Sequence, residues 1–66
     1  MNYFKNTLNT LKTDRAKHVY LQWMRGLFSN DIFEQCHKYA IADYAENPTA
    51  ENLDTINDFA YLMNEV

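Results

Sequence analysis

The chain has 66 residues, of which 47% are hydrophobic and 15% aromatic, and its formal net charge is −3. The single cysteine, Cys36, excludes an internal disulfide and favours a reducing, cytoplasmic location. One Gly and one Pro argue against an all-β or disordered chain, and no apolar run suits a signal peptide or a membrane span. We therefore expect one domain over residues 1–66 with an all-α fold, a small bundle of three main helices plus a short N-terminal helical segment.

The charge is divided unevenly along the chain. Residues 1–30 hold five basic side chains and one acidic one (5 − 1 = +4), whereas residues 31–66 hold one basic side chain and eight acidic ones (1 − 8 = −7). The two halves sum to the net charge of −3. Opposite charges of this kind can attract each other within one chain, pair two chains in a homodimer, or attract different partners.

The N-terminal segment, residues 2–12, has apolar side chains spaced for one helical face, namely Phe4, Leu8 and Leu11. Its Asn and Thr residues are poor helix formers, so this helix depends on docking against the rest of the domain. We predict a break near residues 12–13, with Thr13 or Asp14 as the N-cap of the next helix. One continuous helix to residue 27 is the alternative.

The central helix carries the densest run of large apolar side chains. Six of them share an arc of about 140° on a helical wheel, which predicts a core-facing stripe: Ala16, Val19, Tyr20, Trp23, Met24 and Leu27. The apolar sector extends past this stripe through Leu21 and Phe28, so the helix has more apolar surface than one neighbour covers. Because aromatic and Arg side chains concentrate binding energy, Leu21, Arg25 and Phe28 form the first predicted partner-binding surface.

The third helix is predicted over residues 32–46, after the break around Gly26. Asp31 and Glu34 form a variant of the capping box at its start. Its apolar face gathers Ile32, Phe33, Cys36, Tyr39, Ala40 and Tyr44. Asp43 falls within this face, where a carboxylate needs a partner or water. It is therefore an edge residue, a member of an ion pair with Lys17, or a functional acid.

The last helix follows Pro48, with Asn47 or Thr49 as its N-cap. The predicted buried side of this helix consists of Leu53, Ile56, Phe59, Ala60 and Met63. Four carboxylates lie within about 60° of each other on the other side, and we call them the acidic stripe: Glu51, Asp54, Asp58 and Glu65. We expect the acidic stripe to face solvent, and Glu51, Asp54 and Asp58 form the second predicted partner-binding surface.

No motif specifies a reaction, a cofactor or a metal. Cys36 and His37 are adjacent, so on a helix they point about 100° apart instead of sharing a face as metal ligands do. The chain has no glycine-rich phosphate loop, and helices this short seldom enclose a catalytic cleft. We therefore expect that the protein is not an enzyme and uses no cofactor or metal.

The function that these features favour is a small acidic protein-interaction module, a regulator or inhibitor that binds a larger protein and blocks its surface. Its size and charge are typical of inhibitors from phages and mobile elements. In one alternative, the acidic stripe imitates phosphates and inhibits a nucleic-acid-binding protein. In another, the basic N-terminal half binds nucleic acid itself, with Tyr20 or Trp23 stacking on a base. The core-facing position of both aromatics and the acidic second half disfavour nucleic-acid binding.

Overall fold

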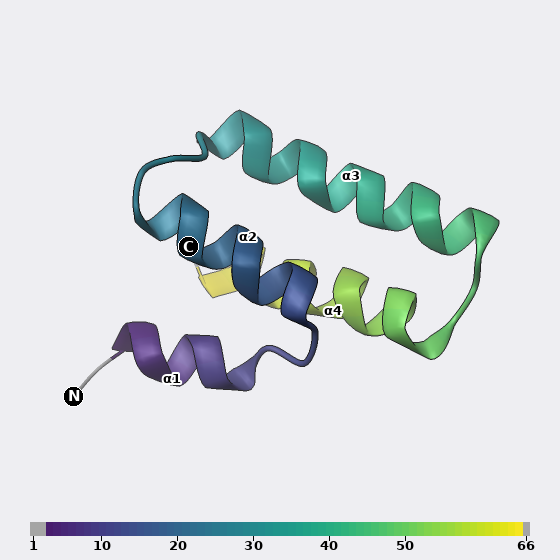
Figure 1. Cartoon of the computed structure of the whole chain (residues 1–66), viewed down its shortest axis with the longest axis horizontal. Helices are drawn as coiled ribbons and strands as arrows, with labels where there is room; N and C mark the ends of the chain where they lie inside the picture. Colours follow the sequence, from purple (N-terminus) through teal and green to yellow (C-terminus); the bar gives the residue numbers. More distant parts are fainter. Residues whose placement is uncertain (1–2, 66) are drawn as a thin grey trace.

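The computed structural model describes the backbone of residues 3–65 and the side chains of residues 4–64. This part of the chain forms four helices and no strand: α1 (Tyr3–Thr10), α2 (Asp14–Met24), α3 (Asn30–Glu46) and α4 (Ala50–Glu65). In Figure 1, α3 runs along α2 and α4, while the short α1 lies on the opposite side of α2. The most extensive helix pairing is between α3 and α4. The predicted all-α fold, with three main helices and a short N-terminal one, is confirmed.

The linker between α1 and α2 is held by a carboxylate from α4. The Asp58 side chain is only 5% exposed, and its Oδ2 accepts hydrogen bonds from the Thr13 backbone N–H at 2.8 Å and the Thr13 hydroxyl at 2.9 Å. The backbone N–H of Lys12 lies 3.0 Å from both carboxylate oxygens. Thr13 is the N-cap of α2, so the carboxylate is placed where the helix dipole favours negative charge. The predicted break is confirmed, and Thr13 is its cap.

A Schellman motif ends α2. The N–H of Gly26 donates to the carbonyl of Trp23 at 3.0 Å, and the N–H of Leu27 donates to the carbonyl of Gln22 at 2.9 Å. This pattern requires a left-handed residue just after the helix, and Gly26 supplies it with a φ of 77°. The one glycine of the chain therefore lies where the backbone turns from α2 toward α3.

Replacing Gly26 by alanine is expected to lower the free energy of unfolding by about 1 kcal/mol. The cause is the left-handed backbone, because nothing lies within 4 Å of the position that a β-carbon would take. Gly26→Asn should cost less, since asparagine tolerates this conformation better. Urea denaturation followed by circular dichroism measures the series. A Gly26→Ala protein as stable as the parent would contradict the assignment.

The start of α3 differs from the prediction. Ser29 is the N-cap, its Oγ accepts a hydrogen bond from the N–H of Ile32 at 3.2 Å, and the helix begins at Asn30. Asp31 therefore lies in the first turn and is not the cap. The capping-box prediction was wrong by two residues, because a serine two positions earlier offers the same type of acceptor.

The start of α4 resolves the two predicted alternatives. The Thr49 hydroxyl accepts a hydrogen bond from the N–H of Asn52 at 3.1 Å, so Thr49 caps the helix. Asn47 caps the other side of the turn: its backbone N–H donates to the carbonyl of Asp43 at 2.8 Å at the end of α3. Pro48 separates the two, as expected of a residue that interrupts one helix just before another begins.

The core is one cluster of buried apolar side chains from the linker, α2, α3 and α4: Leu11, Ala16, Val19, Tyr20, Phe33, Ala40, Phe59 and Leu62. Ring contacts connect the four helices through it. Tyr20 stacks on Phe4 with ring centroids 5.4 Å apart and lies 6.3 Å from Trp23. Trp23 stacks on Phe33 at 4.7 Å, and Phe33 meets Phe59 edge to face at 5.7 Å. Each such pair adds stabilisation beyond the buried area of its rings.

The predicted apolar stripe of the central helix is buried only in part. Ala16, Val19 and Tyr20 are buried, but Met24 and Leu27 are 50% and 65% exposed. The helix ends at Met24, so Leu27 lies beyond the left-handed Gly26 and a helical wheel no longer gives its direction. Placing Met24 and Leu27 in the core was therefore wrong.

Helix α3 is turned relative to its predicted orientation. Phe33 and Ala40 are buried as expected, but Tyr39 is 62% exposed and Ile32 is also exposed. His37, which the pattern left outside the apolar face, is half-buried with its ring 6.0 Å from that of Phe59. The buried face is therefore centred nearer to Phe33 than the hydrophobic pattern predicts.

Helix α4 shows the largest departure. Its buried residues are Thr55, Asp58, Phe59 and Leu62, whereas Leu53 and Met63, predicted to be buried, are exposed. The buried face is rotated by roughly 100° about the helix axis from the predicted one. Both buried polar residues are hydrogen-bonded: Asp58 accepts from the linker, and the Thr55 hydroxyl donates to the carbonyl of Glu51 at 2.9 Å. A pattern that assigns every polar residue to solvent cannot find this orientation.

Asp43 forms an ion pair with a residue other than the predicted one. Arg15 Nη1 of α2 lies 2.6 Å from Asp43 Oδ2, and the two side chains are 41% and 49% exposed. The predicted partner, Lys17, is not the one used. Because both side chains are partly exposed, Asp43 is an edge residue between α2 and α3. Exposed ion pairs of this kind contribute little to the free energy of unfolding.

Candidate protein-binding surface

One end of the bundle brings together the end of α2, the start of α3 and the end of α4 (Figure 1). We call this region the α2–α3 end. It presents four exposed apolar side chains: Met24, Leu27, Ile32 and Met63. Four exposed apolar side chains at one end of a small domain make this end a candidate contact surface.

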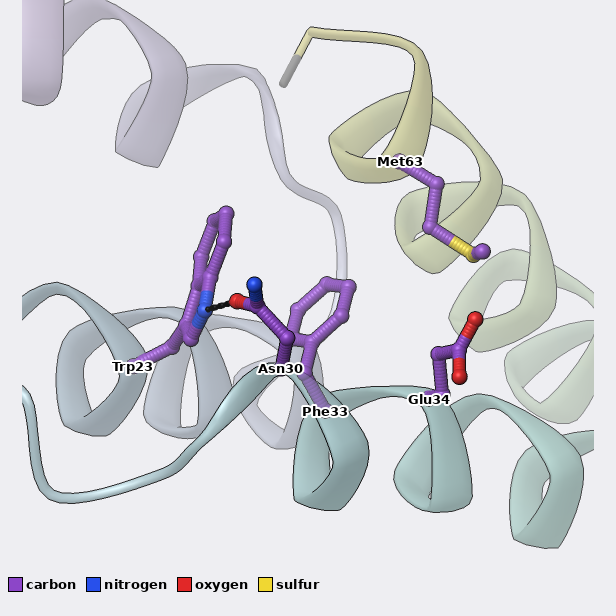
Figure 2. Close-up of a pocket in the computed structure, with 5 residues that line it drawn as sticks. All are labelled: Trp23, Asn30, Phe33, Glu34 and Met63. Atoms are coloured by element: carbon purple, nitrogen blue, oxygen red, sulfur yellow. Dashed lines mark hydrogen bonds between the residues drawn. The ribbon is translucent and has the colours of Figure 1, made fainter.

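A pocket of about 300 Å³ opens at this end, lined by Trp23, Asn30, Phe33, Glu34 and Met63. In Figure 2 the Phe33 ring lies between Trp23 on one side and the Glu34 and Met63 side chains on the other. Two aromatic rings and a thioether form apolar walls, and an amide and a carboxylate supply the polar atoms. The volume is at the lower end of the range for ligand pockets, so one side chain is a more suitable occupant than a large molecule.

The aromatic wall of the pocket is held by contacts within the domain. Trp23 Nε1 donates a hydrogen bond to Asn30 Oδ1 at 2.8 Å, which joins the end of α2 to the first residue of α3 (Figure 2). The stacked ring of Phe33 fixes the indole from a second side, and Phe33 is itself supported by Phe59 in the core. A preorganised wall loses little conformational entropy when a ligand binds.

The first predicted partner-binding surface is only partly available. Arg25 is exposed at the C-cap of α2, and Leu21 is half-buried one turn earlier. Phe28 is half-buried and packs against the core cluster, so much of its ring is already used within the domain. Arg25 belongs to the α2–α3 end, whereas Leu21 and Phe28 offer less apolar surface than Met24 and Leu27 do.

The second predicted surface loses one of its members. Asp58 is buried and bonded to the linker, so the prediction that it faces solvent is wrong. Glu51 is exposed and Asp54 half-buried, while the side chain of Glu65 lies outside the described residues. Glu51 and Met63 are twelve positions apart on α4, about 18 Å along the axis, so Glu51 lies far from the α2–α3 end.

Within residues 4–64, no group of three or more His, Cys, Asp or Glu side chains is placed to hold a metal ion. Cys36 is free and half-buried against the core cluster, where a thiol acts as a small apolar side chain. None of the helices in the described part is long and apolar enough to cross a bilayer.

Sequence reasoning missed most of the residues at the α2–α3 end. Met24, Leu27 and Met63 were assigned to the core because they fit a helical apolar period. Asn30 and Glu34 carried no signal for a pocket, since both are common at the start of a helix. The pocket is formed where the ends of three helices meet, and a local sequence pattern cannot predict contacts between separate helices.

No protein-family model matches the chain, and no curated protein or solved structure is significantly similar to it.

Proposed function

We propose that the protein is a small interaction module that binds a larger protein through its α2–α3 end and thereby regulates or inhibits that partner. The observation that carries the proposal is that this end of the domain exposes Met24, Leu27, Ile32 and Met63 and also holds an aromatic pocket, of which Met63 is one wall. Interface centres are depleted in charge and enriched in aromatic side chains and Met. Burial of these side chains by a partner gives the domain a source of stability that its small core lacks.

The two alternatives have weaker support. Phosphate mimicry depends on a dense row of exposed carboxylates, but Asp58 of the acidic stripe is buried. Nucleic-acid binding depends on free cations and aromatic faces, but Arg15 is paired with Asp43 and Tyr20 is only 3% exposed. Trp23 lines the pocket, where Asn30 and Phe33 hold its indole. A protein partner agrees best with these contacts.

The test compares two variants that remove similar exposed apolar surface from different places. Leu27 is 65% exposed at the α2–α3 end, and Tyr39 is 62% exposed more than two turns along α3. The parent chain and the variants Leu27→Ser and Tyr39→Ser are immobilised and incubated with cell extract, and the retained proteins are compared. We expect a partner that binds the parent and Tyr39→Ser at the same level and binds Leu27→Ser at least tenfold less.

Two further measurements make the result decisive. Circular dichroism and thermal unfolding of both variants should match the parent, because both side chains are largely exposed. Light scattering on a sizing column establishes whether the chain is a homodimer. A dimer that Leu27→Ser dissociates would contradict the proposal, since the surface would then serve self-association. Equal retention of one partner by Leu27→Ser and the parent would also contradict it.

A further inference from the structure

We propose that the pocket between Trp23, Phe33 and Met63 receives an arginine side chain of the partner protein, whose guanidinium pairs with the Glu34 carboxylate. This inference rests on the proposed function and names the chemistry that the partner must present. It comes from the lining of the pocket, in which three residues are apolar, one is a neutral amide and Glu34 is the single charged residue. The pocket therefore suits an apolar stem with a cationic tip.

Charge complementarity selects a cation. Glu34 is exposed, and no salt bridge to it is present among the residues that the structure describes. The (i, i+4) pair with Lys38 that the sequence permits is not formed as a salt bridge in this part of the chain. In Figure 2 the Glu34 carboxylate lies on the same side of the pocket as the Met63 thioether, beside the space next to Phe33. A cation entering along that apolar wall reaches the carboxylate directly.

Arginine fits this lining better than lysine does. Its planar guanidinium is weakly hydrated, packs against aromatic rings and can bind a carboxylate through two parallel hydrogen bonds. Its methylene stem can lie along Met63 and Phe33 while the charged group stays at the rim. Arginine is also among the residues that dominate binding energy at protein interfaces.

The test uses the only tryptophan as a reporter. The Trp23 indole N–H gives a single resolved signal in an ¹H–¹⁵N correlation spectrum, and its ring lines the pocket. The probes are two blocked peptides in which leucines flank either one arginine or citrulline, the neutral analogue of the same shape. We expect the arginine peptide to shift the indole signal with an affinity about fivefold higher than the citrulline peptide, as an ion pair near the surface allows.

The controls are two variants with the same change of charge. In Glu34→Gln the two peptides should bind equally, whereas in Glu51→Gln, at the other end of α4, the fivefold preference should persist. Equal binding of both peptides to the parent chain would overturn the inference, as would loss of the preference in Glu51→Gln. Failure of the arginine peptide to shift the indole signal at millimolar concentration would also overturn it. The comparison of Leu27→Ser with Tyr39→Ser tests the proposed function without these peptides. A failure of the proposed function can therefore be distinguished from a failure of the arginine inference.

Discussion

The Asp58→Ala protein is expected to lose about 3 kcal/mol of its free energy of unfolding, most of what a domain of this size has. The buried carboxylate accepts hydrogen bonds from the Lys12 N–H, the Thr13 N–H and the Thr13 hydroxyl. Alanine leaves these three donors without acceptors in a site that is nearly closed to water. It also removes the negative charge at the N-terminus of α2.

A graded series separates the hydrogen bonds from the charge. In Asp58→Asn, the amide oxygen can take the place of Oδ2 and keep both bonds from Thr13, while the amide NH2 replaces Oδ1 and faces the Lys12 N–H, another donor. We therefore expect a smaller loss than in Asp58→Ala, about 1–2 kcal/mol, from the missing charge and the weakened Lys12 contact. Asp54→Ala is the matched control, because Asp54 is one turn earlier on α4 and more exposed. Urea denaturation followed by circular dichroism measures all three. Equal losses in Asp58→Ala and Asp54→Ala would contradict the role of Asp58.

The helix boundaries could be predicted because local chemistry determines them. Thr13 and Thr49 offer side-chain acceptors at helix starts, and Gly26 supplies the left-handed residue at the end of α2. Each of these residues acts within four positions of itself, so a local sequence pattern is enough to predict the boundary. The start of α3 was misplaced because Ser29 and Asp31 are both good caps and the pattern does not rank them.

The buried faces were less predictable because they depend on contacts between distant residues. Asp58 has an acidic side chain on a helix with other acidic residues, and its burial is explained only by its bonds to Thr13 and Lys12, which are 45 and 46 positions away. Burying it turns Phe59 and Leu62 toward the core and leaves Met63 at the surface. The candidate site depends on the same rotation, because Met63 lines the pocket at the α2–α3 end. Because the buried hydrogen bonds of Asp58 were not predicted, Asp58 was wrongly assigned to an exposed surface and Met63 was wrongly assigned to the core.

Phe59→Ala is expected to unfold most of the protein at 25 °C. The Phe59 side chain is completely buried and meets the rings of Phe33 at 5.7 Å and His37 at 6.0 Å. Truncation of a core phenylalanine costs about 3–5 kcal/mol, which is comparable to the stability of a small domain. Far-ultraviolet circular dichroism should show a large loss of helix, and dispersion of the amide signals in an NMR spectrum should collapse.

Two further variants keep this prediction testable if Phe59→Ala cannot be purified. Phe59→Leu retains most of the apolar volume, so it should fold with a loss of about 1–1.5 kcal/mol and a lower melting temperature. Leu53→Ala on the same helix should cost less, because the leucine side chain is 43% exposed. Phe59 also supports Phe33, on which Trp23 stacks, so Phe59→Leu should broaden or shift the indole N–H signal while Leu53→Ala leaves it in place. An unchanged indole signal in Phe59→Leu would show that the pocket wall does not depend on the core beneath it.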